Sequence, residues 1–212
     1  MHDMNDPHAR QPVLTLGPAP KSARVTLIMA HGRGASAEDM LGLAAEFGTT
    51  DVAFLAPQAA GRTWYPHSFL SPMQDNEPGI SSGLRVIAGL VDGLVAQDIA
   101  HARIALIGFS QGACLSLECA ARHPQRYKAV IGLSGGLIGP AGTPRDYAGS
   151  LGGAPVFLGC SDVDAHIPLA RVHESAEVFR RMGASVDERI YPRMGHTVNE
   201  DEIRAVTALL LS

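Results

Sequence analysis

Short apolar or alternating runs are interspersed with amphipathic segments along most of the chain. The runs have the length of buried strands, and the segments between them carry apolar residues at helical spacing. The pattern predicts strands at 25–29, 52–55, 104–107, 130–133, 155–159 and 186–191, and helices at 37–47, 82–99, 113–122, 167–182 and 200–211. Such an alternation indicates βαβ units. We therefore expect an α/β fold with a mostly parallel sheet and helices on both faces.

The composition favours one domain. With 212 residues, 46% of them hydrophobic, the chain can bury a single substantial core. Residues 1–23 are polar and contain prolines, and we expect a flexible N-terminal segment there, followed by a single domain at 24–212. The longest loops, 57–78 and 134–153, are too short to form a cap domain.

Charge and cysteine content narrow the range of partners. The formal net charge is −4, and no block of Lys or Arg offers the positive surface that binds nucleic acid. No run reaches the roughly 18 apolar residues of a membrane span. The three cysteines cannot all pair, and two lie in one predicted helix, so we expect free thiols and a cytoplasmic location. No Cys/His cluster has the spacing of metal ligands, and a homodimer is left open.

The segment Gly108-Phe109-Ser110-Gln111-Gly112 lies between a predicted strand and a predicted helix. A G-x-S-x-G sequence in that place is typical of the nucleophile elbow of serine hydrolases. The two glycines lack a Cβ, so the backbone can turn sharply and hold the serine hydroxyl exposed. In mostly parallel sheets the site lies at the carboxyl ends of the strands. Ser110 is therefore the candidate nucleophile.

A serine nucleophile needs a base, and the base needs an acid that orients it. In the chain order Ser, acid, His, both partners follow Ser110 on later loops. His196 comes just after the strand predicted at 186–191 and is the candidate base. The candidate acids are Asp162 and Asp164, on the loop after strand 155–159. The pattern alone does not separate them, because either can also cap the following helix.

An oxyanion hole requires backbone N–H groups aimed at the carbonyl oxygen of the substrate. One donor is expected from Gln111, the residue after the nucleophile. The second is expected from the loop His31-Gly32-Arg33-Gly34, whose glycines let the backbone approach a substrate. We choose the N–H of Arg33. The alternative is that His31 and Gly32 only shape the turn.

Together these segments resemble the phospholipase/carboxylesterase family of α/β-hydrolases, which includes bacterial carboxylesterases and acyl-protein thioesterases. The resemblance runs from about Val25 to the C-terminus and rests on four motifs in order, His31-Gly32-x-Gly34, Gly108 to Gly112, Asp164-Ala165-His166-Ile167-Pro168 and Gly195-His196. It implies an α/β-hydrolase fold without a cap domain, and hydrolysis of carboxylic esters or thioesters without a cofactor. It also implies a triad of Ser110, Asp164 and His196, because the family's acid is followed by x-x-[VI]-P.

The resemblance draws attention to three positions near the substrate. Family members often have an aromatic pair beside the site, which implies substrate binding by Trp64 and Tyr65; ordinary packing of the loop against the core is the alternative. Pro66 stands where the family commonly has Asp, and Arg33 where it commonly has an apolar residue. Arg33 either favours an ester that bears a carboxylate or points to solvent. We favour solvent, because arginine is mostly exposed.

The sequence therefore predicts a serine esterase that cleaves small carboxylic esters, with thioesters as a further substrate class, through an acyl-enzyme. Short acyl groups are expected because the Gly-rich loop 134–153 is poorly suited to walling a tunnel. One alternative is a dienelactone-type hydrolase, although such enzymes use Cys where this chain has Ser110. Another is a ligand-binding protein on the same fold. The complete set of Ser110, Asp164 and His196 argues against it.

Overall fold

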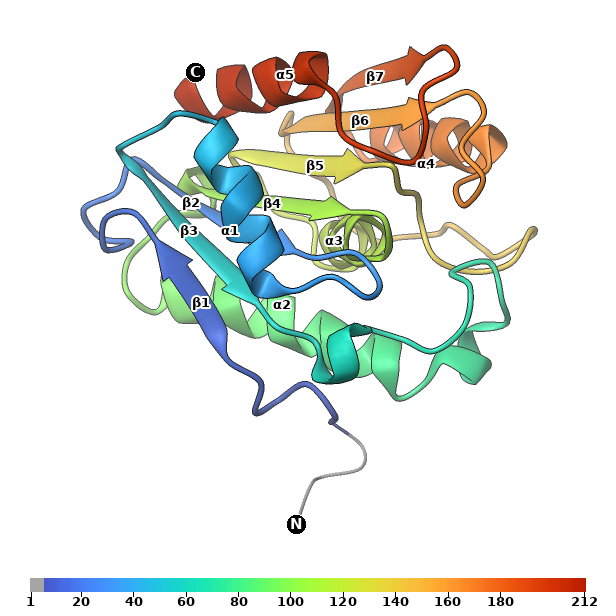
Figure 1. Ribbon diagram of the computed structural model, residues 1–212, viewed down its shortest axis with the longest axis horizontal. Coiled ribbons are helices and arrows are strands. Elements are labelled where there is room, and N and C mark those ends of the chain that lie inside the picture. The colour runs from blue at the N-terminus through green and yellow to red at the C-terminus, as the bar shows by residue number, and fades with distance from the viewer. Residues whose placement is uncertain (1–5) are drawn as a thin grey trace.

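The computed structural model describes residues 6–212, which form a seven-stranded sheet with helices on both faces (Figure 1). The strands are β1 (Val13–Leu16), β2 (Val25–Ala30), β3 (Val52–Pro57), β4 (Ile104–Phe109), β5 (Ala129–Leu133), β6 (Pro155–Ser161) and β7 (Ser185–Tyr191). The helices are α1 (Ala37–Glu46), α2 (Gly79–Val95), α3 (Gln111–Arg122), α4 (Leu169–Arg181) and α5 (Glu200–Leu211). All the strands and helices predicted from the hydrophobic pattern are present, with ends shifted by a few residues, and the predicted fold class is confirmed.

The sheet brings the ends of several strands to one edge. Its order is β1-β3-β2-β4-β5-β6-β7. Strands β2 to β7 are parallel to their neighbours, and β1 alone pairs antiparallel, with β3. The carboxyl ends of β4, β6 and β7 therefore lie along the same edge, and the loops that carry Ser110, Asp164 and His196 begin there.

Two hydrophobic clusters cover the faces of the sheet. Helices α2, α3 and α4 pack on one face, where residues such as Ile87, Leu115 and Phe179 are almost fully buried. Helices α1 and α5 cover the other face, with Met40 and Val206 in the core (Figure 1). Strand residues bury both faces of the sheet, as expected for parallel strands between two helical layers. No helix of the described residues is long and apolar enough to cross a membrane.

Strand β1 is the element that the hydrophobic pattern did not predict. It pairs from Val13 opposite Pro57 to Leu16 opposite Phe54, inside the segment expected to be flexible. Ahead of it, His8 is buried: its Nε2 lies 2.9 Å from the carbonyl oxygen of Trp64, and its Nδ1 accepts a hydrogen bond from the N–H of Ala60. The folded domain therefore begins well before residue 24. For residues 1–5 the expected flexibility stays a prediction, because these residues lie outside the described part of the chain.

The first turn of α5 contains a buried carboxyl group. Asn199 and Glu202 form a capping box, in which each side chain accepts a hydrogen bond from the backbone N–H of the other residue. The second carboxyl oxygen of Glu202 lies against Gly159 of β6 and, within residues 6–212, has no hydrogen-bond partner. Burial raises the pKa of Glu202 from an ordinary 4.5 to about 7, against the opposing effect of the backbone hydrogen bond from Asn199.

Candidate active site

The turn at Ser110 depends on the two glycines that flank it. Ser110 has φ 54° and ψ −117°, a strained conformation for a residue with a side chain. A Cβ on Gly108 would lie 2.2 Å from the carbonyl group of Gly112, and a Cβ on Gly112 would lie 2.1 Å from the carbonyl oxygen of Ala30. Neither backbone group can move away easily. Glycine at both positions therefore allows β4, the turn and α3 to pack this closely.

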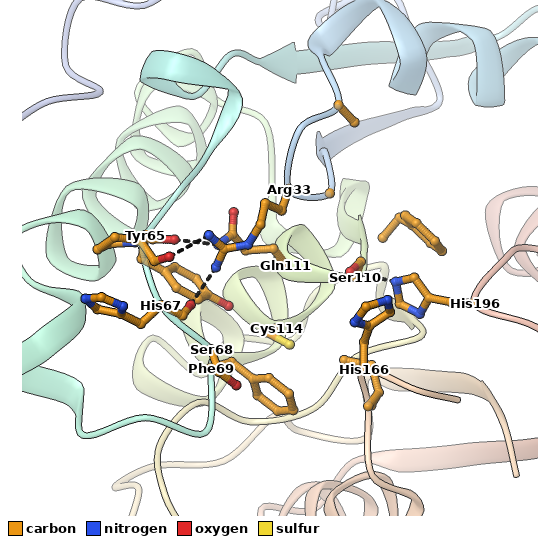
Figure 2. Close-up of a pocket in the computed structure, with 15 residues that line it drawn as sticks. Arg33, Tyr65, His67, Ser68, Phe69, Ser110, Gln111, Cys114, His166 and His196 are labelled. Atoms are coloured by element: carbon orange, nitrogen blue, oxygen red, sulfur yellow. Dashed lines mark hydrogen bonds between the residues drawn. The ribbon is translucent and has the colours of Figure 1, made fainter. Parts of the chain in front are cut away.

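Three side chains that lie far apart in the sequence form a hydrogen-bonded chain. His196 Nε2 is 2.8 Å from Ser110 Oγ, a contact drawn in Figure 2, and His196 Nδ1 is 2.7 Å from Asp164 Oδ2. The Asp164 side chain is fully buried, whereas the His196 side chain is 20% exposed. The hydroxyl group therefore faces the pocket, and the carboxylate is held behind the imidazole.

The two candidate acids have different surroundings. Besides the contact with His196, Asp164 accepts hydrogen bonds from the backbone N–H groups of His166 and Ile167, and the thiol of Cys160 lies 3.8 Å away. Burial acts to raise the pKa of Asp164, but the hydrogen bonds from His196 and the backbone outweigh it and hold that pKa below its usual value. Asp162 instead accepts from the backbone N–H of Arg193. Of the two aspartates, only Asp164 contacts the imidazole.

The two expected oxyanion-hole donors lie on neighbouring segments. Gln111 is the first residue of α3, and the loop after β2 passes so close that a Cβ on Gly32 would lie 3.4 Å from Ser110 Cβ. Within residues 6–212, neither the N–H of Gln111 nor that of Arg33 donates to another protein group. Both groups are therefore left without a protein acceptor among these residues, and the N-terminus of α3 favours negative charge near Ser110.

The Gln111 side chain fastens the loop 57–78 to the nucleophile turn, a role that the motif did not suggest. Its amide oxygen accepts from the N–H of Trp64, and its amide nitrogen donates to the carbonyl oxygen of Tyr65. The indole N–H of Trp64 in turn donates to the carbonyl oxygen of His31. These bonds tie the loop after β2, the loop 57–78 and the turn at Ser110 into one unit.

Both residues of the aromatic pair are buried in the core, but only one of them lines the pocket. Tyr65 belongs to the pocket wall, whereas Trp64 is fully buried behind it and does not line the pocket. The Tyr65 hydroxyl lies beside Cys114 and has no nitrogen or oxygen partner among the described residues. Burial raises the pKa of both Tyr65 and the Cys114 thiol, the latter to about 12. Both groups are therefore neutral near pH 7.

The pocket at Ser110 has a volume of about 410 Å³ and a partly apolar wall that includes Phe69, Phe109 and Ile167. The side chain of Arg33, which we expected to point to solvent, is exposed but lines this pocket (Figure 2). His166 also lines it, with its ring centroid 4.8 Å from that of His196. The sequence offered only one signal for His166, its place two residues after Asp164. In the part of the chain that the structure describes, no group of three or more His, Cys, Asp or Glu residues could hold a metal ion.

Comparisons with known proteins agree with this architecture. A family model described as Phospholipase/Carboxylesterase matches residues 16–211. A phospholipase/carboxylesterase from Dyadobacter fermentans, known from a crystal structure, shares 37% sequence identity with this chain. The two structures align with a TM-score of 0.91 over 95% of this chain and 97% of that one. Acyl-protein thioesterase 1 of Gibberella zeae is 29% identical over 65% of this chain and 59% of its own length. Lysophospholipase-like protein 1 of Mus musculus is 26% identical over 63% of this chain and 56% of its own length. The chain thus spans less than two thirds of these two curated relatives.

The protein has the α/β-hydrolase fold, as its sheet order and its similarity to the Dyadobacter structure show. Because the family model covers nearly the whole sequence, the chain belongs within that class to the phospholipase/carboxylesterase family. The resemblance stated from the four sequence motifs is confirmed.

Proposed function

We propose that the protein is a serine hydrolase that cleaves small carboxylic esters, and thioesters by the same route, through an acyl-enzyme. The observation that carries the proposal is the hydrogen-bonded chain from Ser110 through His196 to Asp164 at the wall of a pocket. A serine that only packs or caps a helix needs neither a strained backbone nor an imidazole directed at its hydroxyl. The names of the related proteins, an acyl-protein thioesterase and a phospholipase/carboxylesterase, support the same reaction class.

In the proposed reaction His196 takes the proton of Ser110 as the hydroxyl oxygen attacks the carbonyl carbon of the ester. The N–H groups of Gln111 and Arg33 stabilise the oxyanion, an effect worth about a hundredfold or more in rate for a single donor. His196 then gives the proton to the leaving alcohol or thiol. Asp164 holds the imidazole in the required tautomer and stabilises its protonated form. Water repeats the sequence on the acyl-enzyme and releases the acid.

Two further features of the proposal concern substrate size and location. We expect short acyl groups, because the pocket of about 410 Å³ is lined by loops and by residues of β4 and α3 rather than by a cap domain. We also propose a cytoplasmic location, which is supported by the absence of disulfides at Cys114, Cys119 and Cys160, all buried as free thiols.

The test is labelling with a fluorophosphonate, together with hydrolysis of p-nitrophenyl acetate and an acetyl thioester. We expect the native chain to be labelled and active, and the variant Ser110→Ala to lose labelling and nearly all turnover while it keeps the circular dichroism of the native chain. Ser22→Ala removes an exposed serine far from the pocket and is expected to behave like the native chain. Labelling or near-native turnover in Ser110→Ala would refute the assignment. An unlabelled native chain would favour a ligand-binding protein.

A further inference from the structure

Among the described residues, the pocket is lined by basic groups and by no acidic one. Of the 15 residues that line it, none is Asp or Glu, whereas Arg33, His67, His166 and His196 carry basic side chains (Figure 2). The nearest carboxylate of the site, Asp164, is fully buried behind His196. A substrate that enters this pocket therefore meets a surface suited to negative charge.

Arg33 is the permanent charge in this wall, and its guanidinium is held in place. One terminal nitrogen donates to the carbonyl oxygen of Pro66 at 2.7 Å, and the other donates to that of His67 at 2.5 Å. These bonds use two of the five N–H groups of a guanidinium and leave three to bind a ligand. Among residues 6–212, no carboxylate forms an ion pair with Arg33. Within the described part of the chain, Arg33 is thus an oriented cation without a counter-charge.

The position of Arg33 indicates which part of a substrate it would meet. Since His196 must give its proton to the leaving group, the alcohol part of an ester lies on the side of His196. Arg33 lies on the opposite side of Ser110, together with Tyr65 and His67 (Figure 2). The acyl part extends in that direction, so Arg33 meets the far end of the acyl group.

We propose that Arg33 is a specificity-determining residue that selects acyl groups ending in a carboxylate, so that the preferred substrates are half-esters of short dicarboxylic acids. The carboxylate binds the free N–H groups of the guanidinium, a pairing for which arginine geometry is well suited. The methylene groups of the acyl chain lie against the apolar wall that includes Phe69. This inference rests on the proposed serine-hydrolase function of the same site.

The test compares pairs of substrates that differ in charge but hardly in shape. Monoethyl malonate, succinate and glutarate are each paired with the corresponding ethyl ester that ends in a neutral amide, and kcat/KM is measured at low ionic strength. The comparison is made at pH 8, where a guanidinium keeps its charge, and the Arg33 variants described next assign the preference to that side chain. We expect the native chain to prefer the carboxylate by about tenfold at the best-fitting length, a modest effect because Arg33 is exposed. Added salt should reduce the preference.

Variants separate recognition by Arg33 from general support of the loop. Arg33→Gln keeps the backbone N–H and should bring the preference close to one, while Arg33→Lys keeps the charge and should retain part of it. Arg204→Gln is the control, because Arg204 is an exposed arginine of α5 that pairs with Glu200 and Asp201 away from the pocket, and it should leave the preference unchanged. If Arg33→Gln slows both members of each pair equally, Arg33 only supports the loop and the proposal is wrong.

The native chain alone also provides a decisive result. A native enzyme that hydrolyses the neutral esters but shows no preference for any carboxylate overturns this inference and leaves the proposed function intact. A chain that hydrolyses no ester and is not labelled by the fluorophosphonate overturns both.

Discussion

Replacing Glu202 with glutamine removes a titrating group from the first turn of α5, and we expect it to change how stability depends on pH. The folded chain keeps a proton on Glu202 up to about pH 7, whereas the unfolded chain releases it near 4.5. Between these values the folded state binds more protons than the unfolded state. The free energy of unfolding of the native chain therefore falls as the pH rises from about 4.5 to 7, and this loss is complete above 7.

The expected size follows from the surroundings of the carboxyl group. At 1.36 kcal/mol for each pH unit, the interval from 4.5 to about 7 corresponds to roughly 3 kcal/mol. Since the unfolded chain has already released most of this proton at pH 5, about 2 kcal/mol of the loss falls between pH 5 and pH 8. Glutamine can still accept the hydrogen bond from Asn199. Its NH₂ group takes the place of the unpartnered oxygen beside Gly159, at a cost that does not vary with pH.

The measurement is urea unfolding of both chains at pH 5 and pH 8, followed by circular dichroism. We expect the free energy of unfolding of Glu202→Gln, relative to that of the native chain, to rise by about 2 kcal/mol between the two pH values. The control is Glu200→Gln, since the Glu200 side chain lies in the same turn and is 94% exposed; its difference from the native chain should not vary with pH. A difference for Glu202→Gln that is equal at both pH values would refute the reasoning.

Three further predictions concern the site and its support. Asp164→Asn should lower kcat/KM for p-nitrophenyl acetate roughly ten thousandfold. Asp162→Asn, which affects only a loop contact with Arg193, should lower kcat/KM far less. The reverse ranking would mean that the acid is misassigned. Gly112→Ala should greatly reduce the yield of folded protein, because the added Cβ would meet the carbonyl oxygen of Ala30. Gly89→Ala is the comparison, since Gly89 is exposed on α2 with open space around it. This variant should raise the free energy of unfolding by about 0.5–1 kcal/mol in a urea titration. For p-nitrophenyl esters of rising chain length, kcat/KM should increase over the first few carbons, at about 0.8 kcal/mol per buried methylene, and level off before roughly eight; a continued rise would indicate a channel.

The sequence was most informative where one physical factor determines the outcome. A strand such as Ala129–Leu133 is apolar on both faces because helices cover both, so its pattern is unmistakable. β1 gives no such signal, because it is a four-residue edge strand in which Val13 and Leu16 stay 38% and 44% exposed. Its place in the sheet depends on a partner, β3, about forty residues further along the chain.

The same distinction applies to the candidate site. Ser110 and His196 follow directly from chain order and from their places after strands, whereas the choice of Asp164 over Asp162 needed the family motif. The directions of the side chains could not be predicted. Trp64 and Tyr65 are neighbours in the chain and both are buried, yet only Tyr65 lines the pocket. The orientation of Arg33 depends on the carbonyl oxygens of residues more than thirty positions away, which no local pattern reveals.

The path of the chain before β2 limits how far the protein could be shortened. Val13–Leu16 covers the outer edge of β3, so a chain starting at residue 24 would leave the backbone N–H and C=O groups of that strand free to pair with another molecule and to aggregate. The same trimming would remove His8 from the carbonyl oxygen of Trp64 and from the N–H of Ala60. The loop 57–78, which contributes to the pocket wall, would then lose a support that comes from the segment ahead of β1.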